Sequence, residues 1–113
     1  MENNITENNF WYALNEPAPV IFINGYSDKI YEWRNEKGEI HRENDLPAFI
    51  RYYRNGNSKQ KIWYQNGKRH RIGGPATIWY NEDGSCFIEC WYLNGNMYTE
   101  EDYWQKFKEM GYE

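Results

Sequence analysis

Two histidines and two cysteines are the side chains of this chain that suit metal binding or acid-base chemistry. His41 and His70 are each followed by arginine and occupy the same place in two copies of a repeated phrase. A residue that recurs with a repeat unit serves the unit itself. We therefore expect both histidines to hydrogen-bond backbone across a hairpin. The sequence has no zinc-site spacing of cysteine and histidine.

Cys86 and Cys90 lie four residues apart on one expected strand. At about 3.3 Å per residue they are roughly 13 Å from each other, too far for a disulfide between them. No serine stands in a nucleophile-elbow setting, and no glycine-rich phosphate loop is present. We expect a protein that is not an enzyme, with no catalytic residue, no metal and no cofactor. The lack of a signal peptide, of an apolar run near 20 residues and of a disulfide framework predicts a cytoplasmic protein with no membrane association.

A band of positive charge is the sharper candidate for a binding site. Residues 46–81 carry seven basic side chains and no acid, whereas residues 1–45 carry 9 acids against 4 bases and residues 82–113 carry 8 against 2. Aromatic rings in a charged surround are typical of protein-binding hot spots. The predicted partner-binding residues are Arg51, Lys59, Lys61, Trp63 and Trp79, with Lys68, Arg69 and Arg71 at the adjoining turn.

Two other uses of the charges remain open. Cations interleaved with Trp63 and Trp79 also suit a single-stranded nucleic acid, whose phosphates they would follow and whose bases would stack on the rings. The acidic ends and the net charge of −4 oppose that interpretation. Alternatively, Glu100, Glu101 and Asp102 mimic phosphate and occupy the channel of a nucleic-acid-processing partner.

The elements that position these residues are short strands joined by tight turns. Asn-Gly or Asp-Gly recurs at positions 24, 55, 66, 83 and 94, with Lys37-Gly38 in an equivalent place. Asn-Gly is the strongest short-range hairpin signal, because a two-residue type I′ turn needs positive φ at both central residues. Gly73-Gly74-Pro75 cannot continue a strand and predicts a loop. Together these signals predict an antiparallel meander of about six to eight strands in which sequence neighbours are sheet neighbours.

Parity along the strands separates two faces. We expect a core face of uncharged residues, comprising Ala48, Ile50, Tyr52, Ala76, Ile78 and Tyr80, joined from adjacent strands by Ile62, Tyr64, Ile88, Cys90 and Tyr92. The opposite face mixes rings with charges and is expected to meet solvent or a partner. It comprises Phe49, Arg51, Tyr53, Lys59, Lys61, Trp63, Thr77, Trp79, Phe87, Glu89 and Trp91.

The C-terminal residues change their period from two to 3.6. Thr99 followed by three acids is typical of a capped helix start, and Tyr103, Phe107 and Met110 share one helical face before Gly111. The expected organisation is one domain, 1–113, with an N-terminal arm or added strand at 1–18, hairpin repeats at 19–98 and an amphipathic helix at 99–111. A composition with 11 Tyr, 6 Trp and 5 Phe favours this mainly β fold.

The repeated phrase resembles a known kind of repeat. Residues 63–80 read Trp-Tyr-Gln-Asn-Gly-Lys-Arg-His-Arg-Ile-Gly-Gly-Pro-Ala-Thr-Ile-Trp-Tyr, residues 91–96 begin the phrase again, and residues 33–53 hold a degenerate earlier copy. This pattern looks like the repeat of bacteriophage, giant-virus and some bacterial proteins and is similar to the MORN-repeat variant. The resemblance implies consecutive β-hairpins in an elongated sheet, a role in binding or scaffolding, and no catalytic residue.

We expect a non-catalytic protein-binding module. The resemblance implies a viral or prophage accessory protein that binds and inhibits a host protein, such as a defence nuclease in the manner of an anti-CRISPR. The expected partner is a host or phage protein, with single-stranded nucleic acid and a structural scaffold as alternatives. The basic middle, the acidic ends and the exposed sheet edges also predict a homodimer or salt-sensitive self-association. Lys59 and Lys61 in one copy become Phe87 and Glu89 in the next, so specificity is expected where copies differ.

Overall fold

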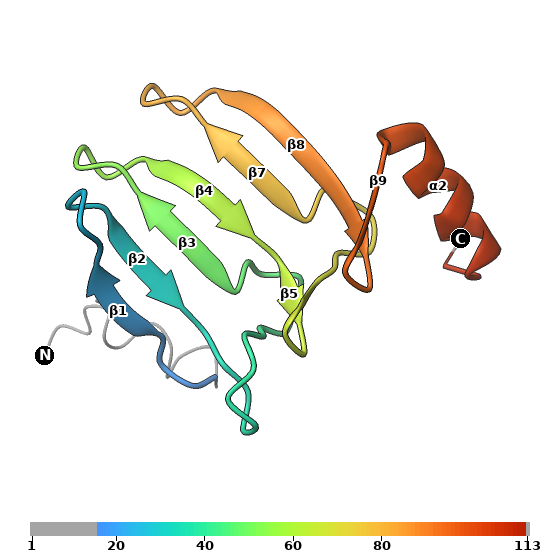
Figure 1. Cartoon of the computed structure of the whole chain (residues 1–113), viewed down its shortest axis with the longest axis horizontal. Helices are drawn as coiled ribbons and strands as arrows, with labels where there is room; N and C mark the ends of the chain where they lie inside the picture. The colour runs from blue at the N-terminus through green and yellow to red at the C-terminus, as the bar shows by residue number, and fades with distance from the viewer. Residues whose placement is uncertain (1–15, 113) are drawn as a thin grey trace, which may run out of the picture.

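The protein is mainly β, and the computed structural model describes residues 16–112. These residues form a seven-stranded antiparallel sheet in the order β1-β2-β3-β4-β7-β8-β9, a separate hairpin of β5 and β6, and a C-terminal helix, α2 (Figure 1). The elements are β1 Val20–Ile23, β2 Lys29–Glu32, β3 Phe49–Tyr52, β4 Ser58–Ile62, β5 Tyr64–Gln65, β6 Lys68–Arg69, β7 Thr77–Tyr80, β8 Cys86–Leu93, β9 Asn96–Tyr98 and α2 Glu100–Glu109. The predicted mainly β fold class is confirmed, but the expectation that sequence neighbours are sheet neighbours throughout is wrong. The β5–β6 hairpin lies outside the main sheet, and β4 pairs with β7. The arm predicted at 1–18 lies almost wholly outside the described residues.

Two kinds of turn connect the strands. At Asn66-Gly67 and Asn94-Gly95 both residues have positive φ, as a type I′ turn requires. At Asn55-Gly56 and Asp83-Gly84 only the glycine has positive φ, and in the turn after β1 Ser27 takes that conformation instead of Gly25. The Asn-Gly and Asp-Gly pairs are turns as predicted, but among these pairs only those of the β5–β6 and β8–β9 hairpins have positive φ at both residues.

A β-bulge adds one residue to the second strand of two repeat units. The register shifts between Arg51 and Tyr52, where β3 pairs with β4, and between Trp79 and Tyr80, where β7 pairs with β8. The bulge and the turn length together place Ile50 opposite Lys61. A shift of one residue moves every following side chain to the other face of the sheet.

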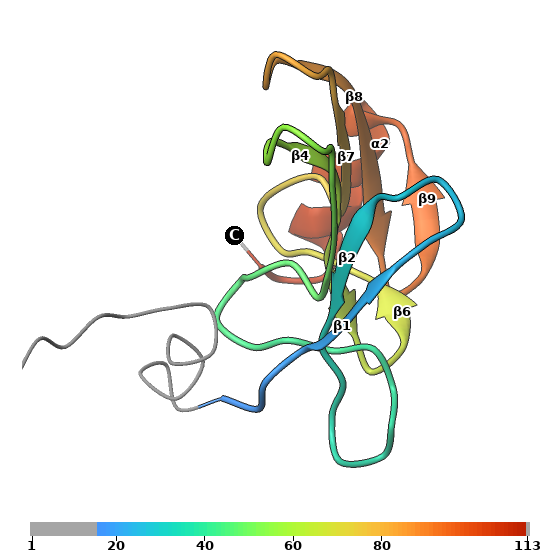
Figure 2. The same cartoon turned by 90° about the vertical axis from the view of Figure 1, so that its left-hand side faces the viewer.

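The apolar core is spread along the sheet. One cluster of buried residues contains Tyr31, Trp33 and Ile50, and another contains Trp91, Leu93 and Tyr103. Figure 2 shows the sheet nearly edge-on as a single layer. The radius of gyration is 15.4 Å, against about 13 Å expected for a compact domain of this length. The repeat units therefore pack on their neighbours along a line.

Helix α2 closes the C-terminal end as the sequence predicts. The Thr99 hydroxyl accepts a hydrogen bond from the backbone N–H of Asp102, and Gly111 follows the helix with φ of 82°. Tyr103 is fully buried against Trp91. Among the described residues, no helix has the length and apolar character needed to cross a membrane.

Candidate protein-binding face

The strand register divides the predicted binding residues between the two sides of the sheet. One side, which we call the arginine face, carries a row of residues that lie directly opposite one another on successive strands: Phe22, Ile30, Arg51, Gln60, Trp79 and Ile88. The other side, the tryptophan face, carries Trp33, Trp63 and Trp91. Arg51 and Trp79 are thus brought together as predicted.

Lys61 and Trp63 were expected beside Arg51, and that expectation is wrong. Lys61 lies opposite Ile50 and Ile78, so it belongs to the tryptophan face, as does Trp63 two residues later. By the same alternation, Glu89 and Trp91 lie there, because Glu89 is opposite Ile78.

Some residues assigned to the core face are also misplaced. Ile62 lies opposite Phe49, Ile88 opposite Trp79, and Cys90 opposite Thr77, all on the arginine face, and Tyr92 joins them by the alternation of β8. The cause is the turn length and the bulges, which parity counting within one strand does not include.

Trp63 is buried where two repeat copies contact each other. Its side chain is covered by Arg71, whose guanidinium carbon lies 3.8 Å from the centroid of the Trp63 ring. Arg71 also donates to the Pro75 carbonyl at 3.1 Å and pairs with Asp45, with Nε 2.9 Å from Oδ1. The Trp63 indole N–H donates to the Asp45 carbonyl at 3.1 Å. Trp63 therefore has little surface to offer a partner.

The same arrangement occurs one copy earlier. The Arg42 guanidinium carbon lies 3.8 Å from the Trp33 ring centroid, its Nη1 donates to the Pro47 carbonyl at 3.1 Å, and its Nη2 pairs with Glu16 at 2.8 Å. The arginine of the repeated His-Arg pair therefore has a structural role in both copies. Sequence reasoning missed the acidic partners, Glu16 and Asp45, because each belongs to the preceding copy.

Each histidine ties its own copy to the turn of the next. Nδ1 of His41 accepts a hydrogen bond from the backbone N–H of Asn66 at 3.0 Å, and Nδ1 of His70 accepts from that of Asn94 at 2.8 Å. The prediction that both histidines hydrogen-bond backbone is confirmed, but the bond reaches the turn of the next copy and does not cross the histidine's own hairpin. Burial lowers the pKa of His70 below its ordinary value, which favours the neutral ring that this acceptor role requires.

The third copy lacks the His-Arg pair, and α2 takes its place. Tyr98 and Thr99 stand where the pair would lie, and the Trp91 ring is covered by Tyr103 and Trp104, at centroid distances of 4.9 and 5.7 Å. The Tyr103 hydroxyl donates to the Arg71 carbonyl at 2.6 Å and accepts from the Gly73 N–H at 2.7 Å. The helix is thus the terminal cap of the repeat.

Most of the remaining cations are engaged within the fold. Lys59 Nζ pairs with Asp28 at 3.0 Å, and this hydrogen bond holds the pKa of Asp28 below its ordinary value. Lys61 lies over the Tyr80 ring at 5.4 Å, and Arg69 donates to the Tyr92 hydroxyl at 3.2 Å. Lys68 is exposed at the β5–β6 turn. The basic band is therefore split between two faces and does not form one continuous track.

At the centre of the arginine face, Arg51 lies between two aromatic rings. The Arg51 guanidinium carbon lies 6.0 Å from the ring centroids of both Phe49 and Trp79, and Gln60 is buried opposite it. Nε of Arg51 is buried and has no hydrogen-bond partner among the described residues. Both Arg51 and Trp79 remain partly exposed.

Apolar side chains flank this centre. Phe22 on β1 is 41% exposed, and Phe87 and Ile88 on β8 are 55% and 45% exposed. Sequence reasoning did not single out Phe22 or Ile88 as site residues. An alignment of the repeat units by their turns does not place these residues in the row of Arg51 without the positions of the bulges, which the structure provides.

The acidic triplet proposed as a phosphate mimic lies elsewhere. Glu100, Glu101 and Asp102 are exposed in the first turn of α2, where carboxylates also suit the positive end of the helix dipole. Among the described residues, no three His, Cys, Asp or Glu side chains are grouped to hold a metal ion. Cys86 and Cys90 are free thiols on β8.

The fold and the site define an internally repeated β-hairpin sheet with a helical cap and a mixed aromatic and basic face. Comparisons with protein-family models, with curated proteins and with solved structures each gave no match.

Proposed function

We propose that this protein is a non-catalytic binding module whose arginine face contacts another protein. The observation that carries the proposal is the pairing of Arg51 and Trp79 at the centre of the arginine face, where both side chains remain partly exposed and the guanidinium carbon lies 6.0 Å from the Trp79 ring centroid. A carboxylate or carbonyl of a partner would form a charge-assisted hydrogen bond with this guanidinium. Tryptophan and arginine are also the side chains most enriched at interface hot spots.

The partner's chemistry follows from this face. An acceptor group, preferably a carboxylate, would meet Arg51, and apolar side chains would pack on Trp79 and on the exposed Phe22 and Phe87. We propose a host protein as the partner and the host cytoplasm as the site of action. The resemblance of the repeated phrase to phage and giant-virus repeats supports an accessory, inhibitory role, including inhibition of a defence nuclease.

Quantitative affinity capture from host lysate tests the face. Arg51→Met keeps the aliphatic stem and removes the guanidinium, and Arg54→Met is a matched control because Arg54 is exposed on the following turn. Proteins captured by the wild type and by Arg54→Met should be lost with Arg51→Met, typically at a cost above about 1 kcal/mol, or roughly fivefold in affinity. Capture that is equal with all three baits contradicts the proposed face.

The two alternatives are tested with the same preparations. Neutralising Glu100, Glu101 and Asp102 to their amides should leave capture unchanged, whereas a phosphate mimic would lose its partner. A gel-shift assay with single-stranded nucleic acid should show no shifted complex at low salt, because the cations of residues 46–81 are divided between two faces of the sheet. A shift that weakens as salt rises would instead support nucleic-acid binding.

A further inference from the structure

The seven-stranded sheet ends in two strand edges that carry apolar side chains. Among the described strands β1 pairs only with β2, and all four residues of β1 are exposed. At the other end, residues 86–90 of β8 pair with β7 on one side, while β9 pairs only with residues 91–93. An exposed apolar strand edge is a template for pairing with another strand.

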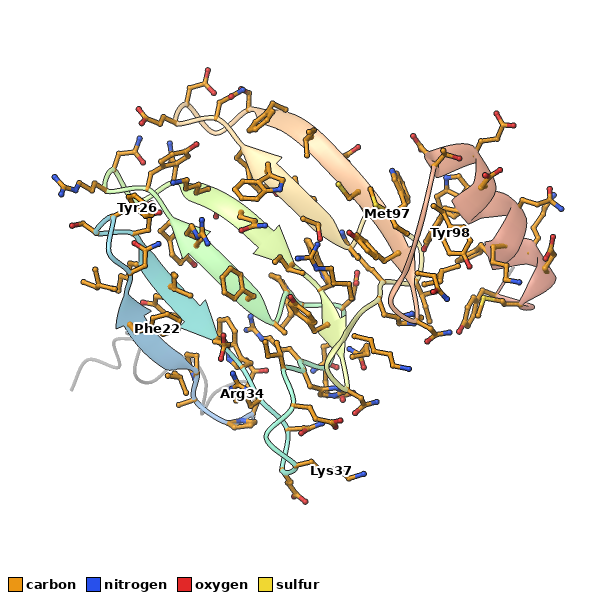
Figure 3. All side chains as sticks on the ribbon, in the orientation of Figure 1. Phe22, Tyr26, Arg34, Lys37, Met97 and Tyr98 are labelled. Carbon is orange, nitrogen blue, oxygen red and sulfur yellow. The ribbon has the colours of Figure 1, made fainter. Side chains whose placement is uncertain are left out.

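The free edge of β8 borders a groove. The groove has a volume of about 680 Å³ and is lined by β8, β9 and the start of α2, including Phe87, Ile88 and Met97. In Figure 3, Met97 lies on β9 beside the edge of β8, and Phe22 lies on β1 at the far end of the sheet. The sheet of one chain therefore has the exposed strand β1 at one end and the groove beside β8 at the other.

The internal junctions of the sheet show how such ends fit together. Each unit consists of a first strand (β1, β3 or β7) and a second strand (β2, β4 or β8). At both internal junctions the second strand of one unit pairs antiparallel with the first strand of the next, so that Ile30 faces Arg51 and Gln60 faces Trp79. Continuing this register places Ile88 opposite Phe22, and Cys90 opposite Val20, of another copy.

At the internal junctions the hydrogen bonds extend one residue beyond the second strand. The N–H of Trp33 donates to the Ala48 carbonyl at 2.9 Å, and that of Trp63 to the Ala76 carbonyl at 2.7 Å. Pro19 occupies the place of Ala48 in the first unit, whereas the place of Trp33 and Trp63 is taken on β8 by Trp91, which pairs with Tyr98 of β9. The joint between copies is therefore confined to the part of β8 before Trp91. Proline lacks an N–H, but the N–H of Ala48 donates within its own unit, to Ile62. Pro19 therefore does not block the junction.

We propose that β1 of one copy pairs with β8 of a second copy, so that the sheet continues head to tail from chain to chain. The groove of one copy is occupied by β1 of another copy. The contact is heterologous, so it extends without closing and the assembly grows with concentration. The pairing buries Phe22 against Ile88 and extends the arginine face across the joint.

The charge of the two ends fixes the salt dependence. Residues 1–45 and residues 82–113 are both net acidic, and the joint brings them together. Their repulsion is screened over about 3 Å in about 1 M salt but extends over about 30 Å in about 0.01 M salt. Association should therefore strengthen as salt rises, whereas pairing of a basic middle with acidic ends would weaken.

Sedimentation velocity on two edge variants tests the geometry. Phe22→Lys blocks β1 and Ile88→Lys blocks β8, and both positions are exposed, so the fold is retained. Each variant alone should stay monomeric where the wild type forms a series of oligomers. A mixture should form dimers and stop, because the intact β8 of Phe22→Lys accepts the intact β1 of Ile88→Lys. Ile72→Lys, at an exposed loop position, is the control and should assemble like the wild type.

A covalent test checks the register. Directly opposed residues in an antiparallel pair have Cα atoms about 4.5–5.5 Å apart, within disulfide range. In a Cys86→Ser background, Val20→Cys should form an oxidised ladder with Cys90 that disappears when Cys90→Ser is added. Ile21→Cys, which points to the other face, should form none.

Three results would overturn the proposal. The first is a wild-type monomer in high salt up to about 1 mM, where an association of about 4 kcal/mol is half complete. The second is assembly by Phe22→Lys alone, which indicates β8 against β8, and the third is equal cross-linking by Ile21→Cys. Arg51→Met should assemble like the wild type, so failure here is distinguishable from failure of the proposed partner face.

Discussion

The histidine and arginine of the repeated phrase act at the scale of single residues, as joints between one copy and the next. His70 accepts a hydrogen bond from the Asn94 N–H, and the Arg71 guanidinium lies over the Trp63 ring while it pairs with Asp45 of the preceding copy. A planar guanidinium can stack and donate several hydrogen bonds at once, which explains why arginine suits this position better than lysine.

His70 predicts a loss of stability in acid. Its pKa is lowered by burial, so the unfolded chain, with an ordinary histidine pKa of about 6.5, takes up the proton first. The contribution of the neutral ring is therefore complete above about pH 6.5 and is lost as the pH falls from there through the folded-state pKa, with a slope of at most about 1.4 kcal/mol per pH unit. Urea unfolding followed by tryptophan fluorescence measures this slope.

His70→Gln is the control, because glutamine can accept the same N–H but does not titrate. Its free energy of unfolding should depend less on pH than that of the wild type in this range. Equal slopes for the two proteins would show that His70 does not couple protonation to folding.

Substitution of Arg71 should lower the free energy of unfolding, an effect that a role in partner binding alone would not produce. Arg71→Ala removes the stacking on Trp63 and the charged hydrogen bond to Pro75, and it should lower the free energy of unfolding by about 2 kcal/mol. Arg71→Lys should recover only part of the loss, and Arg54→Ala, at an exposed turn, should change stability by less than about 0.5 kcal/mol. An unfolding curve of Arg71→Ala equal to that of the wild type would contradict the structural role.

At the scale of elements, α2 takes the place of the His-Arg pair that the last copy lacks. The helix covers Trp91 with Tyr103 and Trp104, where the earlier copies use an arginine. Terminal caps of this kind shield the last unit of a repeat from water. The helix is therefore part of the sheet's packing and not an appendage.

Substitutions of Tyr103 measure how much the packing of α2 contributes to the free energy of unfolding. Tyr103→Ala leaves a cavity beside Trp91 and Leu93 and should cost about 3–5 kcal/mol. Tyr103→Phe keeps the ring but loses the hydrogen bonds to Arg71 and Gly73, at a cost of about 1–2 kcal/mol. Chemical denaturation measures both, with Lys108→Ala on the exposed side of the helix as the control. If Tyr103→Ala matched that control, α2 would not cap the sheet.

At the scale of the whole molecule, a row of units without a closed core implies that stability varies along the row. β4 and β7 pair with strands on both sides, whereas β1 is the exposed edge among the described strands. Free energies of local opening follow such differences in packing. The molecule should open from its N-terminal edge before its centre.

Amide hydrogen exchange measures this gradient. Backbone amides of β4 and β7 should exchange most slowly and those of β1 fastest when the protein is dilute in low salt. In concentrated protein at high salt, protection of β1 should rise, because head-to-tail pairing covers its edge. Uniform protection of β1, β4 and β7 in dilute solution would contradict the description of the fold as a linear row of units.

The sequence by itself determined the mainly β class, the turns, the loop and the C-terminal helix. Asn-Gly pairs gave the turns, Gly73-Gly74-Pro75 gave a loop, and the capped segment after Thr99 gave α2. These are local effects, because φ preference and capping act within a few residues. The structural role of the histidines was also readable, since both recur with the repeat.

Only the tertiary structure decided which side of the sheet each strand residue occupies. The bulges opposite Arg51-Tyr52 and Trp79-Tyr80 moved Lys61 and Trp63 away from Arg51 and brought Ile88 into its row. Likewise, the ion pair between Arg71 and Asp45 joins two copies that are distant in sequence. The physical reason is that a strand's alternation fixes relative positions within it, whereas its pairing with neighbours fixes which face each position joins.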